Sequence, residues 1–273
     1  FVKDNTRVRE PTPVTWTQIH AFRMARHHLD RPAPKSLLAQ AVADACGAQA
    51  QVMTAAQLAL RVRVHGLTID DVERALWQDR SLARVWCMRG AVHIIPAEEF
   101  AVFVRGSSTR QQERSTSWLE RSGASLDSVN HLLDAFAAAM DRPRTRADLA
   151  NHIQSSLGWP IEKAGGRGWG NPADAPGFRL GRSAVTIPDI AWMASYRGLA
   201  CFGPDEGQGT TFVRPDAWLP RFRDLSVENA EDALLRRYLR AFGPATVSDF
   251  AAWSILTLRR ARQIWDRAEH AIY

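Results

Sequence analysis

Two glutamines separated by one alanine are the residues of this chain whose type and spacing suggest chemistry. They lie in Cys46-Gly47-Ala48-Gln49-Ala50-Gln51-Val52-Met53. If this backbone is extended, alternate side chains point to the same side, so the two carboxamides of Gln49 and Gln51 would converge on one small target. A polar loop that leads into a helix has a similar composition, and the pattern alone leaves both interpretations open.

Standard catalytic and metal-binding signatures are missing from the sequence. It contains no HExxH, no GxSxG, no Walker A loop and no CxxC pair, and its eight histidines are scattered. The three cysteines, Cys46, Cys87 and Cys201, are widely spaced, which argues against a disulfide framework or a zinc finger and is typical of a reducing compartment. We therefore expect no metal and no cofactor.

Arginine dominates the positive charge. Lysine and arginine number 35 against 29 acidic residues, giving a net charge of +6, and only Lys3, Lys35 and Lys163 are lysines. Arginine suits phosphate recognition, although a GC-rich genome would produce the same bias. Three clusters are candidates for phosphate contacts, although a run of charge is more often ordinary solvated surface: Arg105, Arg110 and Arg114; Arg142, Arg144 and Arg146; and Arg259, Arg260 and Arg262. The second is the best candidate, because the helix expected after Thr145 would add backbone donors.

A β-hairpin is predicted where two β-rich runs, 83–88 and 91–95, flank Arg89-Gly90. Arg89 at its turn would contact a phosphate or would be solvated. His93 would lie near the substrate or would be a hydrogen-bonded residue on a half-buried strand. Trp77 and Trp86 fit packing positions better than base-stacking platforms.

Most of the chain is expected to be helical. A threonine precedes an acid or amide by three residues at five positions, a pattern that caps helix N-termini. The five threonines are Thr15, Thr54, Thr68, Thr145 and Thr246.

The order of the elements predicts tandem winged-helix repeats, a helix-turn-helix variant, and hence a mainly α fold with small β-hairpin wings. The segments 132–150 and 234–251 resemble copies of one unit. A second hairpin is expected from 199–202 and 210–213, and the Pro/Gly-rich stretch 158–176 reads as a surface loop. We assign residues 1–112, which hold the Gln-x-Gln motif, to a first winged-helix domain and 113–225 to a second. Residues 226–273 would start a third, with helices over 230–242 and 246–267.

Composition narrows the class of protein. With 273 residues, 45% hydrophobic and 23% charged, the chain is of globular rather than disordered or collagen-like type. It holds no apolar run of the length a membrane span needs and no recognisable signal peptide. We expect a cytoplasmic protein without membrane association, and a monomer.

The sequence resembles the tandem winged-helix DNA glycosylases of the AlkZ-like type, which are known for unhooking interstrand crosslinks and for azinomycin resistance. The resemblance rests on Gln49-Ala50-Gln51, Trp77, the run Arg84–Pro96 and the later segments Tyr238–Thr246 and Asp249–Ser254. Members of that family continue with the rest of a third winged helix and a β-rich portion, so the chain looks like a C-terminally truncated member.

The resemblance implies that Gln49 and Gln51 are the catalytic pair of a monofunctional glycosylase. This sequence carries the double-glutamine form, whereas the resemblance associates the Gln-x-Asp form with relatives of a broader substrate range. The implied substrate is double-stranded DNA with alkylated or crosslinked purines, contacted by Arg89, His93, Arg110, Arg114, Arg142, Arg144 and Arg146. A winged-helix transcription regulator without catalysis remains the alternative.

Overall fold

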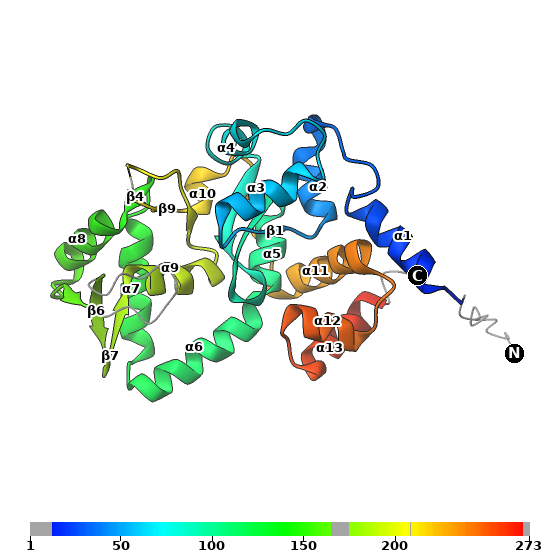
Figure 1. Cartoon of the computed structure of the whole chain (residues 1–273). Helices are drawn as coiled ribbons and strands as arrows, with labels where there is room; N and C mark the ends of the chain where they lie inside the picture. The colour runs from blue at the N-terminus through cyan, green and yellow to red at the C-terminus, as the bar shows by residue number, and fades with distance from the viewer. Residues whose placement is uncertain (1–12, 165–174, 208, 270–273) are drawn as a thin grey trace, which may run out of the picture.

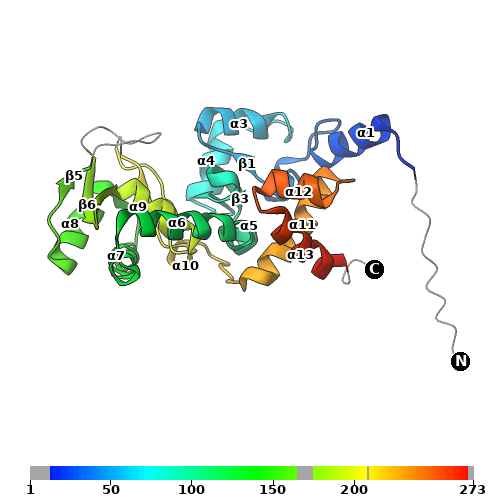
Figure 2. The same cartoon turned by 90° about the horizontal axis from the view of Figure 1, so that it is seen from below.

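The computed structural model describes residues 13–164, 175–207 and 209–269, which form a mainly helical structure with three small antiparallel sheets. This confirms the expected mainly α class. Figures 1 and 2 show three groups of elements in a row: α7 to α9 with their strands at one end, α2 to α4 with β1 to β3 in the middle, and α11 to α13 with α1 at the other end. The elements around β1 to β3 are thus the centre of the molecule.

The middle group contains the Gln-x-Gln segment within a three-stranded sheet. Its order along the chain is α2 (Leu38–Asp44), β1 (Ala48–Gln49), α3 (Met53–Arg61), α4 (Ile69–Trp77), β2 (Leu82–Trp86) and β3 (Val92–Pro96). The strands are arranged β1-β3-β2, all antiparallel. The predicted hairpin is present, but the expectation of a two-stranded wing was incomplete, because β1 adds a third strand.

The second group repeats this order. It runs α7 (Leu126–Ala138), β4 (Arg144–Thr145), α8 (Arg146–Leu157), α9 (Ile187–Tyr196), β8 (Cys201–Phe202) and β9 (Thr211–Val213), with the sheet order β4-β9-β8. In both groups a short strand after the first helix pairs with the last strand. The middle and second groups therefore share one topology, whereas the predicted likeness of 132–150 and 234–251 stays a prediction.

A third sheet was missed by the sequence analysis. It consists of β5 (Glu162–Lys163), β6 (Pro176–Leu180) and β7 (Ser183–Thr186), inserted between α8 and α9. The stretch 158–176, expected to be a loop, therefore contributes strand residues at both ends, and 165–174 lies outside the described residues. Gly177 permits the β6–β7 pairing, since a Cβ there would lie 2.3 Å from the Val185 carbonyl oxygen.

The C-terminal group has one helix more than expected. After α10 (Pro215–Trp218) come α11 (Val227–Phe242), α12 (Val247–Ser254) and α13 (Leu258–Glu269). The prediction of one helix over 246–267 was wrong, because Ile255 adopts a left-handed conformation (φ 56°) that ends α12. The N-terminal helix α1 (Trp16–Arg26) also belongs here: Arg23, Arg26 and His27 bond carbonyls of Pro244, Arg240 and Ala241.

Four of the five predicted caps are confirmed. Thr15, Thr68, Thr145 and Thr246 each cap a helix with a reciprocal hydrogen-bond pair. The Thr54 cap was wrong: α3 begins at Met53, with Val52 before it, so Thr54 lies inside the first turn. Helix α9 has a fifth box, from Thr186 to Asp189, that the sequence analysis missed.

The central sheet is buried on both faces. Along β3, Val92 and Ile94 pack into one core with α2 to α4, whereas Ile95 packs into a second core with α5 (Phe100–Gly106) and α11. The second core also takes in Cys201 and Val213 from the β8–β9 hairpin. Every residue of β3 is buried, so its main chain is held by packing from both sides.

Helices α5 and α11 approach each other closely. A Cβ on Gly106 would lie 2.7 Å from the carbonyl oxygen of Ala230, so a glycine is needed at this crossing. This contact attaches the C-terminal group to the middle group.

A buried carboxylate connects three helices at this junction. Glu231 of α11 is 0% exposed and accepts hydrogen bonds from Arg260 (2.6 and 3.0 Å), Arg267 (3.2 Å) and the Thr109 hydroxyl (2.9 Å). Thr109 lies at the start of α6 (Ser108–Ser122), and the two arginines lie on α13. Glu231 therefore holds α6, α11 and α13 together.

Replacing Glu231 should destabilise the fold strongly. Glu231→Gln leaves Arg260 without its buried counter-charge, while Arg267 keeps Asp232 at 2.8 Å, and we expect a loss of about 3 kcal/mol in the free energy of unfolding. Glu228→Gln, at an exposed position in the first turn of the same helix, is the matched control and should change little. Urea denaturation measures both, and equal stability of the two variants would contradict the assigned role.

Candidate functional site

Gln49 lies at the exposed edge of the central sheet. It pairs with His93 of β3, and directly opposed residues of an antiparallel pair share a face. Ala48 and Ala50, on either side of it, are buried in the core with α2 to α4, while Gln49 is exposed and Gln51 half-buried. Ala48, Gln49 and Ala50 alternate as extended backbone does, whereas the Gln51 carboxamide turns back toward the main chain of β3. Convergence of the two carboxamides on one target stays a prediction.

A backbone hydrogen bond orients the Gln51 side chain. The Ala50 N–H donates to the Val92 carbonyl at 2.7 Å, but the Val92 N–H donates to Gln51 Oε1 at 3.2 Å instead of returning to Ala50. The Gln51 carboxamide thus completes the ladder and ends β1. Because an amide proton requires an acceptor, Oε1 must face Val92, which leaves the Nε2 donor for another partner.

The Ala50 carbonyl oxygen does not accept the Val92 N–H and is contacted by Arg84. Arg84 Nη2 lies 3.4 Å from this oxygen, and its guanidinium stacks 4.5 Å from the ring centre of Phe202 in the second group. Burial lowers the pKa of Arg84. Arg84 therefore links the Gln-x-Gln backbone to the neighbouring unit, a role that the sequence analysis did not predict.

The Arg89 turn connects β2 to β3 and lies just before Val92, whose N–H bonds Gln51. Arg89 (φ 57°) and Gly90 (φ 76°) are both left-handed, as a two-residue type I′ hairpin turn requires. The Arg89 guanidinium lies 3.3 Å from His93 Nε2 and 5.6 Å from the centre of the Trp253 ring on α12. Arg89 is exposed but held from two sides.

His93 orients Arg89 from inside the protein. It is 1% exposed, so the expected half-buried position was wrong. Its Nδ1 lies 3.0 Å from the Ala91 carbonyl, which can only accept, so Nδ1 carries the proton and Nε2 accepts from Arg89. Burial, with a smaller contribution from the Arg89 charge, lowers the pKa of His93 to about 4. His93 is a neutral hydrogen-bonding residue at neutral pH.

The other arginines predicted to bind DNA differ in their partners and in their exposure. Several are engaged by protein partners: Arg144 bonds Asp141 and the Ala139 carbonyl, Arg110 pairs with Glu113, Arg105 with Asp224 and Arg260 with Glu231. Arg146 is half-buried, and burial lowers its pKa. Arg114 and Arg142 are exposed.

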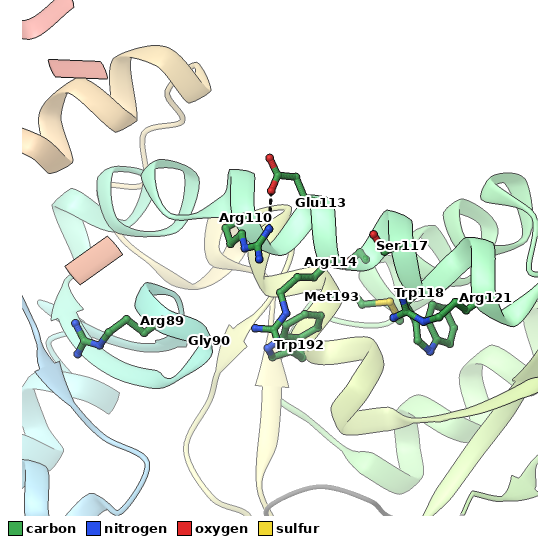
Figure 3. Close-up of a pocket in the computed structure, with 11 residues that line it drawn as sticks. Arg89, Gly90, Arg110, Glu113, Arg114, Ser117, Trp118, Arg121, Trp192 and Met193 are labelled. Atoms are coloured by element: carbon green, nitrogen blue, oxygen red, sulfur yellow. Dashed lines mark hydrogen bonds and ion pairs between the residues drawn. The ribbon is translucent and has the colours of Figure 1, made fainter. Parts of the chain in front are cut away.

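A groove of about 560 Å³ begins at the Arg89 turn and runs between α6 and α9. Figure 3 shows Arg114 extending from α6 toward Trp192 of α9, Arg110 paired with Glu113, and Trp118 and Arg121 further along α6. The sequence analysis missed Arg121, Trp118 and Trp192. Residues 110, 114, 118 and 121 have helical spacing, which would have placed them on one face.

Comparison with known proteins places this arrangement in a family. The model of the DNA glycosylase AlkZ-like family matches residues 42–272. The chain belongs to the AlkZ-like DNA glycosylase family. The match includes β1, the Arg89 turn and all of α6, so the elements that carry the candidate site lie within it.

Two similarities within the AlkZ-like family come from one organism. An interstrand DNA cross-link repair glycosylase of Streptomyces sahachiroi is 28% identical over 243 residues, covering 88% of this chain and 60% of its own length. The structure of the Streptomyces sahachiroi DNA glycosylase AlkZ matches with a TM-score of 0.72 at 23% identity, covering 94% of this chain and 66% of that one. This chain thus spans about three-fifths of the curated relative, and the structural match supports the fold.

Two further observations concern the AlkZ-like chain as described. Within residues 13–164, 175–207 and 209–269, no three His, Cys, Asp or Glu side chains gather as a metal site would require. In the same residues no helix is both long and apolar enough to cross a membrane.

The three cysteines of the chain, Cys46, Cys87 and Cys201, are buried free thiols. Burial raises the pKa of Cys87 to about 12.

The low pKa of His93 predicts a pH-dependent stability. Between pH 6.5 and pH 4, His93 is protonated in the unfolded chain but stays neutral in the folded protein, where it is buried. The unfolded state binds more protons, so the free energy of unfolding falls as the pH drops toward 4. The loss should reach about 3 kcal/mol across that range. His93→Gln removes this component, whereas His131→Gln, at an exposed position on α7, should keep it. Denaturant unfolding at pH 7 and pH 4.5 measures the difference, and identical pH dependence in all three proteins would contradict the assignment.

Proposed function

We propose that this chain is a monofunctional DNA glycosylase that hydrolyses the N-glycosidic bond of cationic N7-alkylated purines, with Gln49 and Gln51 as its catalytic pair. The observation that carries the proposal is the exposed Gln49 beside Gln51, whose Oε1 is fixed by the Val92 N–H at 3.2 Å. Membership of the AlkZ-like DNA glycosylase family supports it.

Neutral amides suit this reaction because the substrate is already activated. A purine alkylated at N7 is cationic, so its departure needs no general acid, and the transition state is mostly an oxocarbenium-like sugar. Carboxamide oxygens accept hydrogen bonds from a water and present negative dipole ends to the developing positive charge. Positioning is the larger contribution, since a glutamine does not act as a base near neutral pH.

The ladder bond gives the two glutamines different roles. Gln51 Oε1 uses one lone pair on Val92 and keeps the other for a water proton, while Nε2 offers two donors. Gln49, at the exposed edge, is the residue that approaches the sugar. In this proposal Gln51 fixes the water and Gln49 faces the lesion.

The two repeated units are proposed to be winged-helix domains that carry double-stranded DNA. Their shared order of helix, strand, helix, helix and two strands supports this assignment. The helices after residue 226 would begin a third such unit. Arg89, His93, Arg110, Arg114, Arg142, Arg144 and Arg146 remain the proposed DNA-binding set, with His93 acting through Arg89.

Crosslinked purines are the proposed extension of the substrate range. A base that is bonded to both strands does not rotate into a closed pocket, so its enzyme must act at an open surface. Gln49 meets this requirement because it is exposed at the edge of β1. The relative named as a cross-link repair glycosylase supports the extension.

Removing either carboxamide should slow base release while DNA binding persists. We expect Gln49→Ala and Gln51→Ala to reduce the single-turnover rate on a duplex containing N7-methylguanine by about tenfold or more, because a positioned water is lost. The assay heats the product in mild alkali and measures cleavage at abasic sites. Gln154→Ala, exposed on α8, is the matched control and should keep the wild-type rate.

The outcomes separate enzyme from regulator. Wild-type rates in both glutamine variants would overturn the catalytic assignment. Sequence-specific retention of DNA with no cleavage would instead indicate a winged-helix transcription regulator.

Salt dependence should report the phosphate contacts. The logarithm of duplex affinity should fall linearly with the logarithm of salt concentration, with a slope near −0.9 per neutralised phosphate. Arg142→Gln should reduce that slope by about 0.9, whereas Arg31→Gln, exposed near α1, should leave it unchanged. Fluorescence anisotropy titrations measure both, and a salt-independent affinity would rule out phosphate binding.

A further inference from the structure

The groove between α6 and α9 has the size and charge of a ligand site separate from the glutamine pair. Its volume of about 560 Å³ falls within the range of small-molecule pockets, about 300–1,000 Å³. It reaches the Arg89 turn at one end. The groove therefore adjoins the candidate site without containing Gln49 or Gln51.

Positive charge in the groove is largely unneutralised by the protein. Arg89, Arg110, Arg114 and Arg121 line it with one carboxylate, Glu113, which pairs with Arg110 at 3.1 Å. Among the ion pairs of the described residues, none involves Arg89, Arg114 or Arg121. Guanidinium groups without a protein carboxylate suit phosphodiester oxygens, which they bind in bidentate fashion.

Two indole rings share the groove with these cations. Trp118 lies on the arginine-bearing face of α6, and Trp192 projects from α9 (Figure 3). Both are half-buried, and Trp192 is supported by an edge contact with Tyr196 at 5.1 Å. A supported ring that remains partly accessible offers a stacking surface for a nucleobase.

Alternating arginines and indoles favour an unpaired strand over a duplex. In a duplex the faces of the bases are covered by their neighbours, so a ring recessed in a groove reaches only a base that has left the stack. Proteins that bind single strands combine a basic groove with aromatic platforms in this way. Phosphates on the arginines and a base on Trp192 would be recognised together.

We propose that the α6–α9 groove binds an unpaired stretch of DNA, with a base stacked on Trp192 and its phosphates on Arg114 and Arg121. The inference deepens the proposed function and rests on it: opening the duplex at a damaged purine supplies unpaired nucleotides, and the groove starts at the Arg89 turn beside the glutamines. The groove would hold the opened strand while the damaged base is released.

Binding of undamaged oligonucleotides tests the groove without any base release. The probe is a fluorescein-labelled thymidine oligonucleotide of about ten residues, compared with a duplex of the same length. Trp192→Ala should raise the Kd for the single strand about fivefold or more, Trp192→Phe should retain most of the affinity, and the duplex Kd should change little. Trp16→Ala is the matched control, because this tryptophan is 72% exposed on α1, outside the groove.

The arginines provide a second, independent measurement. Arg114 and Arg121 are exposed, so the double replacement Arg114→Gln with Arg121→Gln should leave the fold intact even if Trp192→Ala does not fold. It should reduce the salt slope for the single strand by about 1.4, or about 0.7 for each lost phosphate contact. Arg31→Gln should leave that slope unchanged.

Each pattern of results decides the proposal. Wild-type single-strand affinity in folded Trp192→Ala, or an unchanged salt slope in the arginine variant, overturns it. The proposal is also overturned if the groove variants lose affinity for a uridine RNA oligonucleotide but not for the thymidine DNA oligonucleotide. If the groove variants lose single-strand binding while the wild-type protein releases no N7-methylguanine, the groove stands and the glycosylase proposal fails. If the protein releases the base and the groove variants keep wild-type single-strand affinity, the groove proposal alone fails.

Discussion

The buried main chain of β3 fixes the positions of the groups around the candidate site. This strand is buried throughout, with Val92 and Ile94 in one core and Ile95 in the other. A backbone packed from both sides has little freedom to shift, because protein interiors are close-packed. The Val92 N–H that orients Gln51 and the His93 ring that orients Arg89 both come from this strand, so the buried strand fixes the positions of both side chains.

Strand β3 and its neighbour β2 together connect the three groups of elements. Trp86 of β2 packs on Phe202 of the second group, with ring centres 4.4 Å apart, and Arg84 stacks on the same ring. On the opposite face, the second core takes in Leu234 of α11. Tyr196 of α9 donates to the Cys87 carbonyl, two residues before Arg89, at 2.8 Å, so α9 and the groove beside it are held against the Arg89 turn.

The chemistry of the site is that of neutral groups near cations. Gln49 and Gln51 supply amide dipoles, His93 is uncharged because burial lowers its pKa to about 4, and the charge resides in the surrounding arginines. Such a set suits a substrate that brings its own activation as a cationic base and its own negative charge as phosphates. In the proposed mechanism the arginines hold the phosphates and the amides position a water.

Local features could be predicted from the sequence: four threonine caps, the Arg89-Gly90 turn, the mainly helical class, and the family resemblance. The sequence also singled out Gln49 and Gln51, because alternation along an extended segment is a property of neighbouring residues. Other features became visible only in the folded chain: β1 and β4 complete their sheets, and Ile255 divides two helices. Arg105, Arg144 and Arg260 are engaged by protein partners, while Arg114 and Arg142 are exposed. Strand pairing, burial and ion pairing join residues distant in sequence, so they depend on which faces meet when the chain folds.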